Sequence, residues 1–265
     1  MLRFESMNTA RHLKLVVDRR PQSRRGWELS EETMPQSIVH NDSTGLIEAI
    51  LSFRARSWPN TRIARDLAIR WDERNPKIGI DPDVCVLCPA PPLENGNLRS
   101  VRTWIPGHKA PIFAVEMVSD TNPRKDYEIA PEKYAESGTG ELCIFDPMLA
   151  GPKSLGGPYR LQLWCRDESG EFRRVYAGSG PVYSPAIGGY LVPVEDGRKL
   201  RIAEDEAGIH LWPTAEEAER SAKEVEQKAK EMERKAKEME RKAKEEALLR
   251  VAFFEAALRK TTKKE

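Results

Sequence analysis

Residues 113–145 decide the fold, and they read FAVEMVSDTNPRKDYEIAPEKYAESGTGELCIF. The stretch opens within the apolar run Ile112–Val118 and closes with Leu142–Phe145, two short segments typical of buried strands. Between them, the residues around Tyr127–Ser137 favour a helix that stops before Gly138. A strand, a helix and a second strand in this order predict one crossover unit, on a sheet that is open to ligands at its strand ends.

The segments on either side extend this unit to an α+β domain. Upstream, Asp42 or Ser43 can cap a helix that carries Leu46, Ile47, Ile50 and Leu51 on one side. Strands are predicted next at Thr61–Trp71 and Val84–Leu87. Downstream, segments separated by Gly, Pro and Asp predict hairpins at Tyr159–Cys165, Phe172–Tyr176, Tyr190–Val194 and Lys199–Ala203. We therefore expect a mixed sheet with flanking helices.

Composition narrows the class of protein. The 265 residues include 43 Lys and Arg, 42 Asp and Glu, and four Cys, which suits one domain with an appendage. No apolar run is long enough to span a membrane, and no secretory signal is evident near the N-terminus. Cys85 and Cys143 fall in apolar runs where reduced, buried thiols are usual. These features predict a cytoplasmic protein without a membrane partner.

The C-terminal segment 214–265 has a different pattern. The sequence AKEMERK occurs at Ala229–Lys235 and again at Ala236–Lys242, so that Ala and Met recur at alternating spacings of three and four. Glu and Lys also recur four residues apart in the order that stabilises a helix. We expect a long helix to about Lys260 and a coiled coil, although a lone charged helix remains an alternative. A second copy would cover the apolar end, Leu248, Leu249, Val251, Phe253, Phe254 and Leu258.

The sequence thus divides into three parts. Residues 1–27 form a basic N-terminal extension, residues 28–213 the folded domain, and residues 214–265 the charged helical tail. Arginines in the extension and in a later loop could flank a nucleic-acid groove, although such clusters are ordinarily solvated. They are Arg19, Arg20, Arg24, Arg25, Arg99 and Arg102.

Several kinds of site are disfavoured by spacing. Cys85 and Cys88 would point to opposite faces of an extended strand, and no second Cys or His pair completes a zinc site. Neither a Gly-rich phosphate loop nor a GxSxG nucleophile motif is present. The four histidines, His12, His40, His108 and His210, do not suggest a metal cluster.

Acidic residues within apolar strands are the strongest candidates for chemistry. Asp83 lies at the entry of one predicted strand, and Glu116 lies inside another. A buried carboxylate without a partner is costly, so Glu116 requires a compensating group. A salt bridge to an Arg is one explanation. The other is a Mg²⁺ ion held by Asp83, Glu116 and a backbone carbonyl, with a bound water as nucleophile. The residues alone leave these two explanations balanced.

The ordered set of motifs between His40 and Asp146 resembles the Uma-two family of restriction-endonuclease-like proteins, within the PD-(D/E)xK nuclease superfamily. The motifs are Pro82-Asp83-Val84, Val115–Ser119, Asp126, Lys133–Gly138 and Leu142–Pro147. The resemblance implies a restriction-endonuclease-like core and hydrolysis of nucleic acid, with DNA as the expected substrate. It also implies that Asp83 and Glu116 hold Mg²⁺, with Mn²⁺ as a substitute.

The sequence departs from the superfamily pattern at its lysine. Val118 occupies the position two residues after Glu116, and Ala130 occupies the helix position used by the related family. Lys133, one helical turn later, is the preferred catalytic substitute, and Lys125 is the second choice. Glu48 and Asp126 are candidate accessory residues, with a solvated flank as the alternative for Glu48. The displaced lysine also leaves open an inactive nuclease fold that acts as a coiled-coil interaction module.

Overall fold

In a computed structural model of the chain, residues 27–28 and 38–261 are described, without the side chains at positions 38, 39, 247, 249 and 251–261. The chain forms two compact units, Met1–Thr214 and Ala215–Glu265. The predicted N-terminal extension lies outside the described residues except for Trp27, which is buried. Arg19, Arg20, Arg24 and Arg25 therefore remain without a structural test.

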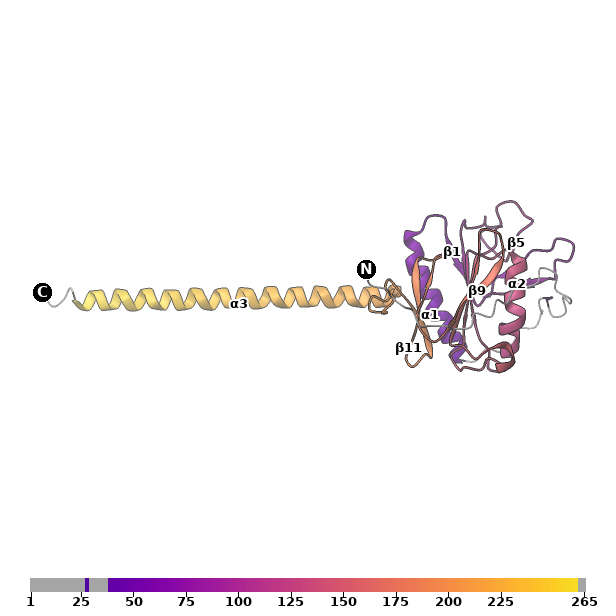
Figure 1. The fold of residues 1–265 in the computed structure, drawn as a ribbon. Helices are drawn as coiled ribbons and strands as arrows, with labels where there is room; N and C mark the ends of the chain where they lie inside the picture. Colours follow the sequence, from indigo (N-terminus) through magenta and orange to yellow (C-terminus); the bar gives the residue numbers. More distant parts are fainter. Residues whose placement is uncertain (1–26, 29–37, 262–265) are drawn as a thin grey trace, which may run out of the picture. The chain divides into compact units, whose positions relative to one another are not determined.

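A six-stranded mixed sheet forms the centre of the first unit (Figure 1). Its strands are, in spatial order, β1 (Arg62–Ala64), β4 (Val84–Leu87), β6 (Phe113–Met117), β7 (Glu141–Phe145), β8 (Leu161–Arg166) and β9 (Phe172–Gly178). β6 and β7 are parallel, and the other neighbouring strands of this sheet are antiparallel. The parallel pair is joined by the π-helical turn η2 (Lys125–Ile129) and helix α2 (Ala130–Ser137). The predicted crossover unit is therefore confirmed.

Two three-stranded sheets complete the unit. One contains β3 (Gly79–Ile80), β2 (Ala68–Arg70) and β5 (Ser100–Arg102), and the other contains β10 (Val182–Ser184), β11 (Gly189–Val194) and β12 (Lys199–Ala203). The single strand predicted for Thr61–Trp71 is wrong, because it divides into β1 and β2 in different sheets. The break lies near Asp66, whose φ of 48° is incompatible with a continuous strand.

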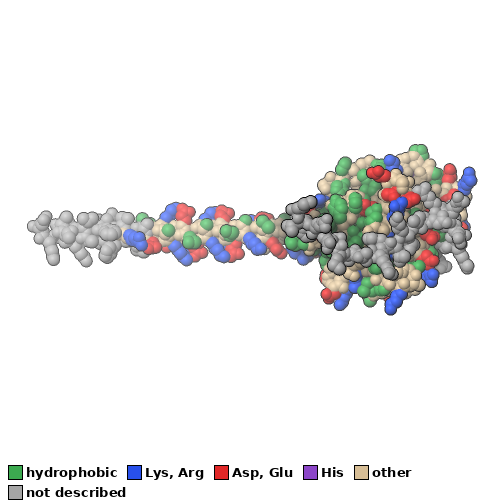
Figure 2. All heavy atoms as spheres, in the orientation of Figure 1, with side chains coloured by type: hydrophobic (Ala, Val, Ile, Leu, Met, Phe, Trp, Pro, Cys, Tyr) green, Lys and Arg blue, Asp and Glu red, His purple; other side chains and the backbone are tan. Residues whose placement is uncertain are grey.

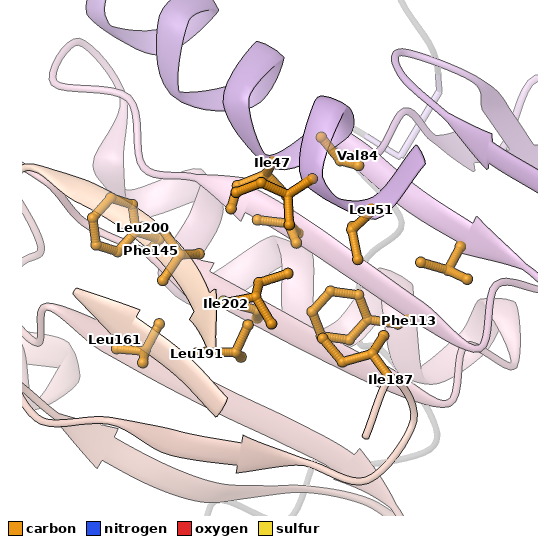
Figure 3. Close-up of a cluster of buried hydrophobic side chains, with 14 of the residues drawn as sticks. Ile47, Leu51, Val84, Phe113, Phe145, Leu161, Ile187, Leu191, Leu200 and Ile202 are labelled. Carbon is orange, nitrogen blue, oxygen red and sulfur yellow. The ribbon is translucent and has the colours of Figure 1, made fainter. Parts of the chain in front are cut away.

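The hydrophobic core has one cluster on each face of the central sheet. On one face, helix α1 (Ile38–Arg54) and the sheet of β10–β12 cover the strands, with Ile47, Leu51 and Phe113 packed together (Figure 3). On the other face, α2 and the sheet of β2 pack against the alternate side chains, including Tyr134 and Ile144. Strands buried on both faces explain the continuous apolar runs of the sequence.

Helix α1 begins earlier than the sequence predicts. Asp42 and Ser43, the expected caps, lie inside the helix, which starts at Ile38. The Thr44 hydroxyl donates to the carbonyl oxygens of His40 and Asn41, so a polar side chain in the first turns is accommodated by the helix backbone. The extra turn brings His40 into the helix. Two short 3₁₀ turns, η1 (Ala55–Ser57) and η3 (Lys153–Leu155), complete the helical segments.

The second unit is the helix α3, Ala215–Thr261, whose 47 residues extend over roughly 70 Å. The predicted long helix is confirmed, whereas its pairing in a coiled coil stays a prediction. Basic and acidic side chains lie side by side along its described part, with hydrophobic side chains between them (Figure 2). Of the predicted apolar end, Leu248 is exposed, and the side chains of Leu249, Val251, Phe253, Phe254 and Leu258 lie outside the described residues.

Across residues 27–28 and 38–261, none of the helices combines the length and apolar character that crossing a membrane requires.

Candidate acidic site at the ends of the central strands

Asp83 and Glu116 come from neighbouring strands of the central sheet. Asp83 directly precedes β4, Glu116 lies near the end of β6, and the two strands pair with Val84 opposite Val115. The backbone N–H of Met117 donates to Asp83 Oδ2 at 2.6 Å. This hydrogen bond holds the carboxylate of Asp83 beside the residue that follows Glu116, so the two acids predicted from the sequence occupy the same end of the sheet.

Glu116 is a buried acid with little compensation. Its side chain is 4% exposed, and the Tyr134 hydroxyl donates to Oε1 at 2.7 Å. Burial and the neighbouring charge of Asp83 raise the pKa of Glu116 well above its ordinary value. Within the described part of the chain, no Lys or Arg nitrogen lies within the 4.0 Å of an ion pair with this carboxylate. The salt-bridge explanation for Glu116 thus has no partner among those residues.

His40 contacts the second acid and was missed by sequence analysis. Its Nε2 lies 3.0 Å from Asp83 Oδ1, and this hydrogen bond is the main cause of a raised His40 pKa. Asp83 therefore has both carboxylate oxygens engaged, one by helix α1 and one by β6. The sequence offered only a histidine shortly before an amphipathic helix. Because the helix cap was predicted at Asp42 or Ser43, His40 was expected to lie outside the helix.

Asp126 belongs to the same electrostatic neighbourhood. It is buried in η2, where Oδ2 accepts a hydrogen bond of 3.1 Å from the Ser119 backbone N–H. Burial raises its pKa to about 6, and the charge of Asp83 adds to the increase. The charge of Asp83 therefore disfavours the ionised forms of both Glu116 and Asp126.

Two lysines offset part of this negative charge. Lys133 is buried in α2, and burial, followed by repulsion from Lys125, lowers its pKa to about 8. Lys125 has a raised pKa, chiefly because of Glu116, and its Nζ lies 3.9 Å from Asp126 Oδ1. The Lys125 side chain is 57% exposed, so solvent weakens this coupling. Both lysines considered from the sequence therefore lie within electrostatic range of Glu116.

The remaining predicted residue, Glu48, has a different partner. Its Oε2 lies 3.6 Å from Arg65 Nη1, and its side chain is 39% exposed. This arrangement matches the solvated-flank alternative, while His40 occupies the position against Asp83 on the same helix. Cys85 and Cys88 are free thiols, the first buried and the second partly exposed.

A divalent metal can be tested against these side chains. No cluster of three or more His, Cys, Asp or Glu suited to a metal is found within the described ranges, so an all-side-chain cage is excluded there. Asp83 and Glu116 nevertheless supply the hard oxygen donors that Mg²⁺ prefers, and their mutual repulsion raises the pKa of Glu116. The pair fits an ion whose remaining ligands are water or backbone oxygen.

Comparisons with known proteins place the chain in a family. The search among curated proteins found no match. A crystal structure of a putative nuclease belonging to DUF820 from Anabaena variabilis is similar, with 14% identity and a TM-score of 0.42, over 60% of this chain and 78% of that one. Residues 24–193 match the family model of Uma2, described as "Putative restriction endonuclease". This match spans Asp83, Glu116, Asp126 and Lys133 and more than half of the sequence, and the chain therefore belongs to the Uma2 family of putative restriction endonucleases.

Proposed function

We propose that this protein is a metal-dependent endonuclease of the PD-(D/E)xK superfamily that hydrolyses phosphodiester bonds, with DNA as the expected substrate. Family membership supports nuclease function in general terms. The observation that carries the proposal is the pair of acids at the ends of β4 and β6. Glu116 is buried beside Asp83 and has no Lys or Arg within ion-pair distance in the described chain. A divalent cation at this position would favour the ionised form of Glu116 and offset the charge of Asp83.

In the proposed site, Asp83 and Glu116 hold Mg²⁺ or Mn²⁺. When bound, the ion would supply Lewis-acid chemistry that activates water and offsets charge at the scissile phosphate. The protein's own groups set the geometry of the two acids. Met117 N–H and His40 fix the two oxygens of Asp83, and Tyr134 fixes Oε1 of Glu116. Fixed orientation of this kind reduces the reorganisation needed on binding.

A lysine is proposed to stabilise negative charge on the phosphate. Lys133 was preferred from the sequence because Asp126, Ala130, Lys133 and Ser137 fall along one helical stripe. In the structure, all four of these residues are buried. Electrostatics support Lys125 more strongly, because its raised pKa keeps it charged, whereas Lys133 with a pKa of about 8 is partly neutral near that pH. We therefore retain both lysines as candidates, with Lys125 favoured for charge stabilisation.

The substrate is proposed from the chemistry and not from a basic surface. Sequence analysis suggested Arg99 and Arg102 as flanking groups, but Arg102 Nη2 pairs with Glu94 at 2.7 Å. The whole chain has a formal net charge of +1. Because phosphate contacts dominate nucleic-acid affinity, we expect weak, salt-sensitive binding. A cytoplasmic location remains part of this proposal.

A cleavage assay tests the proposal. Purified protein is incubated with supercoiled plasmid, single-stranded DNA and a structured RNA, each with Mg²⁺, with Mn²⁺ and with EDTA. Cleavage of DNA that requires the metal and is lost in both Asp83→Asn and Glu116→Gln is the expected result. Cleavage of RNA alone would change the substrate, and cleavage in EDTA or by both variants would contradict the proposal.

One observation favours a second candidate. Val118 and Ala130 are buried apolar residues at both positions where the family pattern expects lysine. An inactive fold whose self-association through α3 carries the function would explain this loss. In that case, neither nucleic acid nor metal should affect the first unit, and Mg²⁺ should leave its melting temperature unchanged.

A further inference from the structure

The helix α3 carries an unpartnered apolar stripe. From Ala222 to Ala243, every position of one heptad seam is apolar: Ala222, Val225, Ala229, Met232, Ala236, Met239 and Ala243. Val225 is 65% exposed, and Met232 and Met239 are each 73% exposed. All other positions from Ser221 to Lys244 are charged, Ser or Gln. A helix that is merely solvated has no need for this strict separation.

The seam defines a complete heptad register. Ala occupies each a position from Ala222 to Ala243, and Val225, Met232 and Met239 occupy the d positions. In this register, the e positions are Glu226, Glu233 and Glu240, and the g positions that follow the seam are Lys228, Lys235 and Lys242. The two flanks of the apolar seam therefore have opposite charge in successive repeats.

The flanking charges distinguish two orientations of a helix pair. In a parallel coiled coil, a g residue faces the e residue of the next heptad on the partner, which here places Lys opposite Glu. In an antiparallel coiled coil, g faces g and e faces e, which here places Lys opposite Lys and Glu opposite Glu. The pattern is thus complementary to itself in the parallel orientation alone.

We propose that α3 pairs with α3 of a second copy as a parallel, in-register, two-stranded coiled coil. Its orientation is set by Lys228 facing Glu233 of the second copy and by Lys235 facing Glu240 of the second copy. This inference adds orientation and register to the self-association considered above, and it does not depend on nuclease activity. Because α3 follows Thr214 directly, the parallel orientation tethers both folded units to the same end of the coil.

The ion pairs within each helix are compatible with this arrangement. Glu231 pairs with Lys235 at 2.7 Å, and Glu233 pairs with Lys237 at 2.6 Å, both four residues apart. These pairs support the single helix before association. Long Lys and Glu side chains at g and e can share their charge between the helix and the partner, so the same residues serve both states.

Cysteine cross-linking tests the orientation in the full-length protein. Val225→Cys and Met239→Cys place thiols at two d positions, each of which faces its own counterpart only in a parallel, in-register pair. We expect each variant alone to form a covalent dimer under mild oxidation. Arg234→Cys, on the outer f position, and the unaltered protein are controls for random and native thiols. A dimer by sedimentation that gives neither d-position disulfide would overturn the orientation, and a monomer at all accessible concentrations would overturn the pairing.

Charge reversal tests the register independently. Lys228→Glu with Lys235→Glu places Glu opposite Glu and should weaken dimerisation about tenfold, as expected from several reversed pairs. Adding Glu233→Lys and Glu240→Lys should restore it. The matched control, Lys230→Glu with Lys237→Glu at b positions, also breaks pairs within the helix but lies off the seam, and it should leave the dimer unchanged. Equal weakening by both reversals would contradict the proposed contacts.

Discussion

Glu and Lys occur in two opposite settings in this protein, the acidic site of the central sheet and the surface of α3. Glu116 is buried, accepts a hydrogen bond from Tyr134 and has a raised pKa. Along α3, Glu231, Glu233 and Glu238 are exposed, and each pairs with a Lys one turn later. In the tail, an ion pair forms at little desolvation cost, whereas the carboxyl group of Glu116 is desolvated and has no Lys or Arg within ion-pair distance among the described residues.

The exposed acids of α3 and the buried Glu116 have opposite effects on stability. Exposed pairs of this type contribute about 0.3–0.5 kcal/mol each to a helix. A buried acid without a cation opposes folding when it is ionised. The acidic site is therefore expected to reduce the stability of the metal-free protein, and a buried acid in a core strand is consistent with a role in metal binding.

The largest effect is expected for Glu116→Gln. Gln keeps the hydrogen bond from Tyr134 but cannot ionise, so cleavage should fall about 10²–10³-fold or more, as for loss of a preorganised electrostatic group. Without metal, the same variant should melt at a higher temperature than the wild type near pH 8, because the raised pKa makes ionised Glu116 unfavourable. Glu231→Gln in α3 is the matched control, and it should change neither activity nor melting of the first unit. A metal-free variant less stable than the wild type would contradict the contrast.

The next largest effect is a difference in cleavage rate between variants of Lys125 and Lys133. If Lys125 supplies the stabilising charge, Lys125→Ala should lose about 10²-fold in cleavage rate, whereas Lys133→Ala should retain more activity. Single-turnover rates measured from pH 6 to pH 9 separate the two. Dependence on Lys133 would appear as a fall of activity near its pKa of about 8. Lys237→Ala in the tail is the control, and full activity in both site variants would remove lysine from the mechanism.

Tyr134→Phe should have a smaller effect, mainly on folding. It removes the donor to Glu116 Oε1 and leaves a buried acceptor unsatisfied, which typically costs about 1–3 kcal/mol. Urea unfolding measures the difference. Tyr183→Phe is the control, because this hydroxyl belongs to an exposed residue. Equal stabilities for Tyr134→Phe and the wild type would show that the hydrogen bond does not hold Glu116.

A pH dependence of the stability is expected from Asp126. Its pKa is about 6 in the folded protein against an ordinary value of 3.8, so the folded state keeps the proton longer than the unfolded chain. The resulting stabilisation is complete below about pH 3.8 and is lost as the pH rises through about 6. In EDTA, the free energy of unfolding of the wild type should therefore decline across this interval more steeply than that of Asp126→Asn. If the two proteins showed the same pH dependence of the free energy of unfolding, Asp126 would not be the group that binds the proton.

Sequence analysis predicted the parts of the fold that local patterns determine. The crossover of β6, α2 and β7 followed from two apolar runs and a helical segment between them, and Glu116 was conspicuous as an acid within one run. Boundaries that depend on tertiary contacts were harder to predict. Helix α1 starts at Ile38, before the predicted caps Asp42 and Ser43, and the turn at Asp66 divided one predicted strand into strands of two sheets.

The partners of the acids could not be read from the sequence. His40 is 43 residues from Asp83, and their contact depends on how α1 packs across the sheet. The choice between Lys125 and Lys133 depends on their surroundings. Burial lowers the pKa of Lys133, whereas the side chain of Lys125 is more exposed. Spacing along a helix identified both candidates, but only the surrounding charges distinguish them.

Metal-dependent melting of the wild type and Glu116→Gln tests the central claim most directly. In EDTA, we predict that Glu116→Gln has the higher melting temperature. In Mg²⁺ or Mn²⁺ well above the dissociation constant, the melting temperature of the wild type should rise, while that of the variant stays constant. At one hundred times that constant, the gain in the free energy of unfolding of the wild type should be about 2.7 kcal/mol. The difference between the two melting temperatures should then become smaller or change sign. Equal metal-induced shifts in both proteins, or none in either, would contradict a metal site at Asp83 and Glu116.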